Sequence, residues 1–252
     1  MIYITGDTHG DVHRFSMEFF PEQKEMTKDD VLIICGDFGL VWGYAGEDRS
    51  EKYWLKWLEE KPFTTVFVDG NHENFDRLNT YPVKEWNGGM VHEIRPHVLH
   101  LIRGEVFTIQ EKKFFAFGGA SSHDISDGII DGSKSNWRSE CKKLNKQGKY
   151  MYRVKGISWW EQELPTQEEM DYGNLKLQEN GNEVDYIISH CAPQEIVSVF
   201  SMGLYKSDVL TNYFNEILNS TKFTHWYFGH YHDDKTIMGK FTMLYDNIER
   251  VV

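Results

Sequence analysis

The chain repeats one pattern that limits its fold more than any other feature. A short apolar run ends abruptly and is followed by a residue whose side chain can bind a metal or transfer a proton. The five runs are residues 2–5, 31–35, 66–69, 186–189 and 226–228, and in all but the fourth a glycine comes directly after the run. Short runs of this composition predict buried β-strands. The glycines indicate sharp turns at crowded strand ends, where a residue without Cβ is favoured.

Segments with helical spacing of their apolar residues lie between several of these strands. Residues 48–60 and 207–219 have this spacing, and Thr166–Glu169 has the form of a capping box that begins another helix. Residues 90–119 are extended without a helical period, which predicts mixed strands. Alternation of strands and helices indicates sheets covered by helices, with functional groups beyond the carboxyl ends of the strands.

Length, charge and cysteine content narrow the class of protein. A chain of 252 residues can bury a sufficient core without disulfides. The net charge of −12 disfavours nucleic acids and anionic membranes as partners unless basic groups are concentrated locally. Three cysteines without a CxxC pair suit a reducing compartment. We therefore expect a cytoplasmic protein that spans no membrane, carries no signal peptide and needs no obligate protein partner.

The polar residues at the strand ends are all of types that bind metals or act as acids and bases. They are Asp7, His9, Asp37, Asn71, His72, His190, His230 and His232. In extended chain, residues two apart project to the same side, so Asp7 with His9 and His230 with His232 can each grip one ion. Carboxylate, imidazole and amide donors together suit Mn²⁺, Fe or Zn²⁺ better than Ca²⁺ or Mg²⁺. Seven such ligands are too many for one tetrahedral ion, which predicts two divalent ions sharing a carboxylate.

These residues lie in motifs that resemble a known family. In order and rough spacing, GDTHGD (6–11), GDFG (36–39), GNHE (70–73), His190 and GHYH (229–232) resemble the five signature blocks of the calcineurin-like metallophosphoesterases. The resemblance implies an α/β fold, a four-layer sandwich of two packed mixed β-sheets flanked by helices. It also implies a dinuclear metal centre, with Mn expected and Fe or Zn as alternatives.

The resemblance also implies a role for each site residue. It makes Asp7, His9, Asp37 and His232 ligands of one ion, and Asp37, Asn71, His190 and His230 ligands of the other. Asp37 bridges the two, and a hydroxide held between the ions attacks phosphorus in a phosphodiester or a phosphomonoester. His72 contacts the phosphate together with Asn71 and protonates the leaving oxygen.

The sequence departs from one well-known branch of this family. The arginines that grip phosphate in the protein Ser/Thr phosphatases, and the aspartate that orients the acidic histidine, are absent from the corresponding blocks here. GNHE alone therefore does not indicate a protein phosphatase. The partner that orients His72 stays open between Asp11, Glu73 and Asp124.

Residues 134–155 form the strongest charge asymmetry of the chain. They hold eight basic residues and one acid, a net charge of +7 against −19 for the remainder. One interpretation is a solvated surface insertion, spanning about 121–156 within a single domain of 1–252. The other is a lid or groove that steers a nucleotide or a single-stranded nucleic acid to the metals, with Arg153 as a phosphate clamp.

The function that these residues favour is that of a dinuclear-metal phosphoesterase with a nucleotide-like substrate. Two alternatives remain open: a nucleic-acid processing nuclease, and a non-catalytic binding module on the same fold. The binding module predicts that metal ligands have been lost, and none of them is missing from the motifs.

Overall fold

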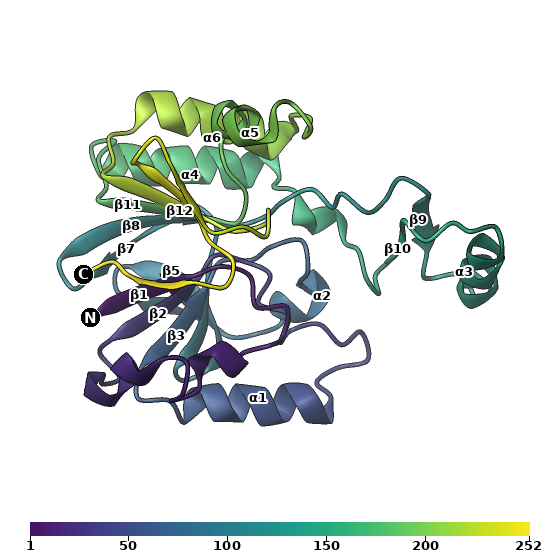
Figure 1. Cartoon of the computed structure of the whole chain (residues 1–252), viewed down its shortest axis with the longest axis horizontal. Helices are drawn as coiled ribbons and strands as arrows, with labels where there is room; N and C mark the ends of the chain where they lie inside the picture. Colours follow the sequence, from purple (N-terminus) through teal and green to yellow (C-terminus); the bar gives the residue numbers. More distant parts are fainter.

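The computed structural model describes residues 1–252 and contains two large mixed β-sheets packed face to face (Figure 1). The seven-stranded sheet has the order β15 (Ile248–Arg250), β1 (Ile2–Thr5), β2 (Val31–Ile34), β3 (Thr64–Phe67), β6 (Val98–Leu101), β5 (Gly89–Arg95) and β4 (Val83–Trp86). The six-stranded sheet has the order β13 (Lys235–Ile237), β14 (Phe241–Met243), β12 (His225–Phe228), β11 (Tyr186–Ser189), β8 (Lys112–Phe117) and β7 (Glu105–Ile109). Helices cover the outer face of each sheet, so the predicted four-layer fold is confirmed.

Each sheet is covered by its own set of helices. On the outer side of the seven-stranded sheet lie α1 (Arg49–Glu59), α2 (Phe75–Leu78) and the 3₁₀ turns η1 (His13–Phe15) and η2 (Pro21–Glu25). On the six-stranded sheet lie α4 (Gln167–Glu179), α5 (Gln194–Ser201) and α6 (Val209–Ser220). None of the helices is both long enough and apolar enough to cross a membrane.

Burial on both faces explains why the strands are continuous apolar runs in the sequence. Along β1, Ile2 and Ile4 pack into the cluster between the two sheets, whereas Tyr3 packs into the cluster under α1. A strand covered on both faces needs apolar residues at every position. Strands β1, β2 and β3 are parallel neighbours, and so are β8, β11 and β12. Their carboxyl ends therefore open at one edge of each sheet.

The structure confirms the predicted elements and adds others. The five predicted runs correspond to β1, β2, β3, β11 and β12, and the predicted helices to α1, α4 and α6. Thr166 caps α4 through the predicted capping box. Helix α3 (Trp137–Lys146) was not predicted, although Trp137, Cys141 and Leu144 lie on one face of it; none of its side chains is buried.

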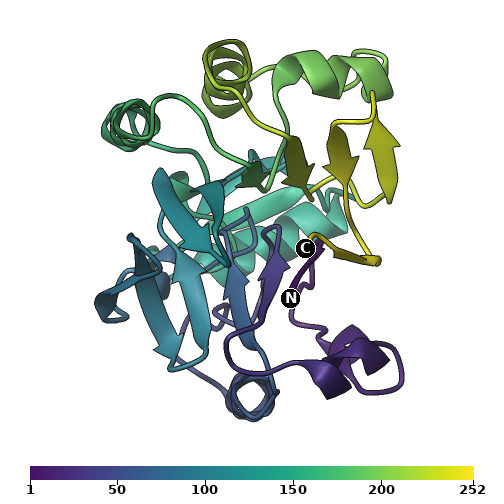
Figure 2. The same cartoon turned by 90° about the vertical axis from the view of Figure 1, so that its left-hand side faces the viewer.

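Residues 121–156, called the arm from here on, extend away from the two sheets (Figure 1). The arm contains α3 and a parallel pair of short strands, β9 (Gly128–Asp131) and β10 (Tyr152–Lys155). It ends before the 3₁₀ turn η3 (Glu161–Glu163). The chain termini lie close together on the main body, because β1 pairs with β15 (Figure 2).

A buried ion pair holds the loop after β3 in place. The Arg103 guanidinium donates to Asp69 at 2.5 and 3.0 Å, and to the Gln162 carbonyl oxygen at 2.7 Å. Burial alone would raise the pKa of Asp69, but Arg103 and His100 outweigh it and hold that pKa well below its usual range. This contact fixes the segment that leads from β3 into Asn71.

Replacing Arg103 by methionine should destabilise the fold, because it leaves the Asp69 carboxylate buried without its main cation. We expect the free energy of unfolding to fall by about 3–5 kcal/mol in urea titration. The double variant with Asp69→Asn should recover most of this loss, since no buried charge remains. A single variant as stable as the parent protein would contradict this account.

Candidate metal centre

The predicted site residues come together where the two sheets meet at the carboxyl ends of their strands. Asp7 and His9 follow β1, Asp37 follows β2, and Asn71 and His72 follow β3. From the six-stranded sheet, His190 follows β11, and His230 and His232 follow β12. Strand ends from both sheets thus contribute to one place.

One group of side chains surrounds Asp7. The Asp7 carboxylate is fully buried, and its Oδ2 lies 3.2 Å from His232 Nε2 and 3.7 Å from His9 Nε2. The two imidazoles also meet each other, with 3.1 Å between their Nε2 atoms. Asp7, His9 and His232 are thus close enough to hold one metal ion together.

A second group surrounds Asp37. Asp37 Oδ1 lies 3.3 Å from His190 Nε2, which is also 3.3 Å from the Asn71 amide oxygen. His190 Nδ1 donates to the Cys35 carbonyl oxygen at 2.8 Å, so Nε2 is the nitrogen that would bind a metal ion after losing its proton. A metal-binding histidine is usually held in this way. Asp37 Oδ2 lies 3.8 Å from His9 Nδ1, which places Asp37 between the two groups.

His230 is oriented differently from the other candidate ligands. Its backbone N–H donates to Asp7 Oδ1 at 2.9 Å, and its ring lies 4.9 Å from that of His190. The Nε2 atom, however, lies 2.7 Å from Nε2 of His123, a residue of the arm. The structure therefore brings His230 to the site but points its free nitrogen toward His123.

The electrostatics of the site call for a cation. Two carboxylates, Asp7 and Asp37, are buried beside each other, and buried charges need compensation. Burial would lower the pKa of His190, but the carboxylates of Asp37 and Asp7 raise it to about 10. Burial keeps the pKa of His230 well below its usual range, which leaves a neutral imidazole able to bind a metal. The donor set therefore fits divalent transition ions, and their binding would displace the proton of His190.

The backbone is strained at the same residues. His9, Asp37, His230 and His232 all have positive φ, between 45° and 70°, and they make up four of the ten such non-glycine residues. This conformation is unfavourable for residues with a Cβ and is typical of functional sites. Gly36 and Gly70 make room for it, because a Cβ on either one would collide with the side chain of His190 or Asp37.

His72 lies on the open side of the candidate centre. It lines a cavity of about 280 Å³ together with His9, Gly39, Trp42 and Arg153. Arg153 reaches His72 Nε2 at 3.3 Å, and Asp124 holds the Arg153 guanidinium at 2.5 and 2.8 Å. Arg153, a residue of the arm, thus places a positive charge beside the candidate metal centre.

The three candidate partners of His72 are placed differently. Asp124 reaches it only through Arg153. Glu73 is buried and accepts from the Phe38 backbone N–H at 2.7 Å, and Asp11 accepts from that of His13 at 3.0 Å. The His72 ring instead contacts Arg153, the His9 ring at 5.0 Å and the Trp42 ring at 5.6 Å.

Two residues that orient Asn71 were not predicted from the sequence. Asn71 Nδ2 donates to Ser122 Oγ at 3.4 Å, and Ser122 Oγ donates to Glu163 at 2.6 Å. This chain of hydrogen bonds directs the amide oxygen of Asn71 toward His190. Ser122 lies at the start of the arm and Glu163 in η3, after its end, and no motif or spacing marks them in the sequence.

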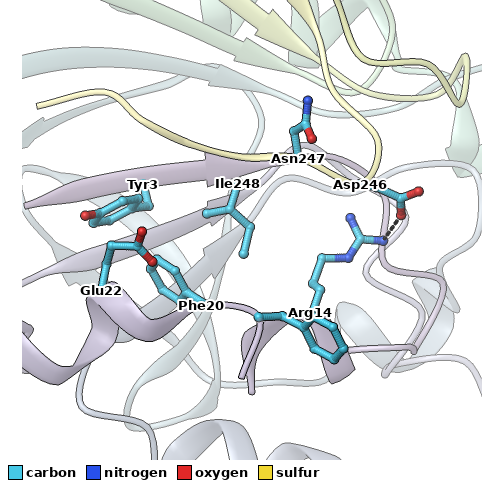
Figure 3. A pocket seen from close by; sticks show the side chains of 8 residues that line it. Tyr3, Arg14, Phe20, Glu22, Asp246, Asn247 and Ile248 are labelled. Atoms are coloured by element: carbon cyan, nitrogen blue, oxygen red, sulfur yellow. Dashed lines mark ion pairs between the residues drawn. The ribbon is translucent and has the colours of Figure 1, made fainter. Parts of the chain in front are cut away.

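Arg14 supports the centre from behind. It donates to the backbone carbonyl of Asp7 at 2.8 Å and pairs with Asp246 at 3.4 Å. Figure 3 shows this ion pair at the edge of a separate pocket of about 460 Å³, lined also by Tyr3, Phe20 and Ile248. That pocket holds no candidate catalytic group and lies apart from the cavity beside His72.

The fold and this donor set define a metal-dependent phosphoester hydrolase. The model of the calcineurin-like phosphoesterases matches residues 1–234, and the chain belongs to this family. The family is dinuclear-metal dependent, in keeping with the two groups of candidate ligands.

Among characterised proteins, the chain is similar to lariat debranching enzymes. That of Gallus gallus is 22% identical over 258 residues, which cover 92% of this chain and 42% of the relative. Lariat debranching enzyme A of Xenopus laevis is 25% identical over 143 residues, which cover 52% of this chain and 26% of the relative. The chain thus spans less than half the length of these relatives.

Gly70→Ala should disrupt the candidate centre by steric overlap alone, because Gly70 has an ordinary φ. Its new Cβ would displace the Asp37 and His190 side chains, an overpacking that costs about 1–3 kcal/mol. We expect the variant to lose most of its bound metal by elemental analysis while its circular dichroism spectrum stays unchanged.

Gly203→Ala is the matched control, since Gly203 has positive φ and open space around its Cα. It should keep its metal despite the backbone strain. Full metal content in Gly70→Ala would show that Asp37 and His190 do not hold an ion.

Proposed function

We propose that this chain hydrolyses phosphodiester bonds in a nucleotide or a nucleic acid, using two divalent ions. The convergence of mixed donors from five strand ends, beside His72 and Arg153, carries the proposal. Asp7, His9, Asp37 and His232 would hold one ion, and Asp37, Asn71, His190 and His230 the other. Carboxylate, imidazole and amide donors favour Mn²⁺, with Fe or Zn²⁺ as alternatives.

The ions, when bound, supply the positive charge that stabilises the transition state of phosphoryl transfer. The protein residues position the substrate around them. Arg153 pairs with the phosphate from the side of the cavity, and Asn71 contributes an amide at its base. His72, 3.3 Å from Arg153, donates a proton to the leaving oxygen.

The surroundings of the centre support a nucleotide-like substrate. The Trp42 ring lines the cavity with His72, so a base can stack on it when the phosphate lies next to Arg153. Helix α3 presents Lys142, Lys143 and Lys146 to solvent. The similarity to lariat debranching enzymes favours a phosphodiester within a nucleic acid over a monoester, and so favours the nuclease alternative.

Residues 1–252 would form one domain, in which the arm is an insertion that helps to bind the substrate. We also place the enzyme in the cytoplasm, because the three cysteines are free, as a reducing compartment requires.

The proposal is tested by an activity screen of the Mn²⁺-loaded protein. The substrates should include a nitrophenyl monoester, its phenyl diester, a cyclic nucleotide, and linear and branched oligonucleotides. Hydrolysis of diesters above the monoester, abolished by a chelator and restored by Mn²⁺, supports the proposal. Hydrolysis of the monoester alone would contradict the diester assignment, and no hydrolysis of any of them would favour a binding module.

His72→Asn should lower turnover by about 10²-fold or more, the usual loss for a general acid. The bound metal should stay intact, because His72 is not among the proposed ligands. A diester with a nitrophenolate leaving group needs no proton, so its turnover should fall much less. Equal losses for good and poor leaving groups would show that His72 serves in binding instead.

Replacing Lys142, Lys143 and Lys146 together by alanine should weaken binding of a single-stranded oligonucleotide. The slope of log affinity against log salt concentration should become shallower by about 2, because three phosphate contacts are lost. Turnover of a nitrophenyl diester should not change. The matched control replaces Lys24, Lys52 and Lys222, which are exposed outside the arm. Equal effects of the two triple variants would show that the arm is a solvated insertion without a role in binding.

A further inference from the structure

Three consecutive residues at the root of the arm contact three different parts of the candidate site. Ser122 accepts from Asn71, His123 meets His230, and Asp124 holds Arg153. Ser122 orients an amide and Asp124 orients a guanidinium, so each of these acts through another side chain. His123 differs, because its own ring nitrogen reaches the site.

The contact between His123 and His230 is close and well supported. Their Nε2 atoms are 2.7 Å apart, and their ring centroids are 4.6 Å apart. On its other side the His123 ring packs against Tyr205 at 4.7 Å. Tyr205 in turn packs edge-on against Tyr231, with 5.3 Å between the ring centroids. Tyr231 is the residue that follows His230 in the chain. The His123 ring thus packs against Tyr205, which Tyr231 supports in turn.

The same arrangement recurs at the first group of ligands. His9 and His232 also bring their Nε2 atoms together, at 3.1 Å, beside Asp7. Two imidazole nitrogens that approach this closely either share one proton or direct their lone pairs at one ion.

We propose that His123 is a further ligand of the ion assigned to Asp37, Asn71, His190 and His230. The inference rests on the proposed function, since it presupposes two bound ions. Four donors leave positions free on an ion that accepts up to about six ligands, and His123 would occupy one of them. The arm is then tied to the metal centre by a bond rather than by packing alone.

The test measures metal binding rather than activity. Calorimetric titration of the metal-free protein with Mn²⁺ should resolve two sites in the parent protein. His123→Ala should weaken one of them by about tenfold or more, at least the loss caused by removing an outer partner of a ligand. The other site should keep its affinity. In the Co²⁺-loaded protein, the visible absorption of the weakened site should change as one nitrogen donor is lost.

His225→Ala serves as the matched control. His225 begins β12 at the end of the strand opposite His230, and its Nε2 lies 2.8 Å from the Thr242 hydroxyl. This variant should bind both ions as the parent protein does. His123→Gln retains a polar side chain that binds metals poorly, and it should reproduce the loss if the alanine variant fails to fold.

Each outcome bears on a different statement. Unchanged affinity at both sites in His123→Ala would overturn the inference and leave the proposed function standing. An equal loss at both sites, with a lower melting temperature, would assign His123 a structural role and also overturn it. A parent protein that binds fewer than two ions would overturn the proposed function itself.

Discussion

The structure depends on the burial of two carboxylates, Asp7 and Asp37, where the ends of two sheets meet. Charges placed there would destabilise the fold without nearby cations. In the protein alone, His190 supplies that charge, since the two carboxylates raise its pKa to about 10. Divalent ions would supply more, and the strained φ of four candidate ligands is the conformational cost of aiming donors at one place. The same two residues thus link the stability of the fold to its chemistry.

Most of the fold could be predicted, because a strand buried on both faces is apolar at nearly every position, a pattern that is easy to recognise in the sequence. The runs at 2–5, 31–35 and 186–189 are apolar at every position, or nearly so, and the observed strands match them closely. The glycines that follow the strands could also be explained from the sequence, as residues at crowded turns. The structure agrees, since Gly36 and Gly70 have no space for a Cβ. Helix α3 has no buried side chain, and its three apolar residues are separated by basic and polar ones, so its sequence resembles that of a surface loop.

The candidate site was predictable only in part. Its donors at strand ends share motifs, so their convergence follows from parallel strands that end at one edge. Ser122, His123 and Glu163 belong to no motif, and they reach the site because the arm leaves and rejoins the main body beside it. These contacts depend on the path by which the chain re-enters the main body after the arm, and the local sequence does not determine that path. Arg153 was recognised from charge alone, and its link to His72 through the cavity wall was not foreseeable.

The central proposal is that Asp37 would bind both of the two ions. Electron paramagnetic resonance of the Mn²⁺-saturated protein tests this most directly, because two ions joined by a shared carboxylate are magnetically coupled. The account predicts the multiline spectrum of a coupled pair, and its replacement by isolated-ion signals in Asp37→Asn. A parent protein that shows only isolated Mn²⁺ signals at full occupancy would contradict it.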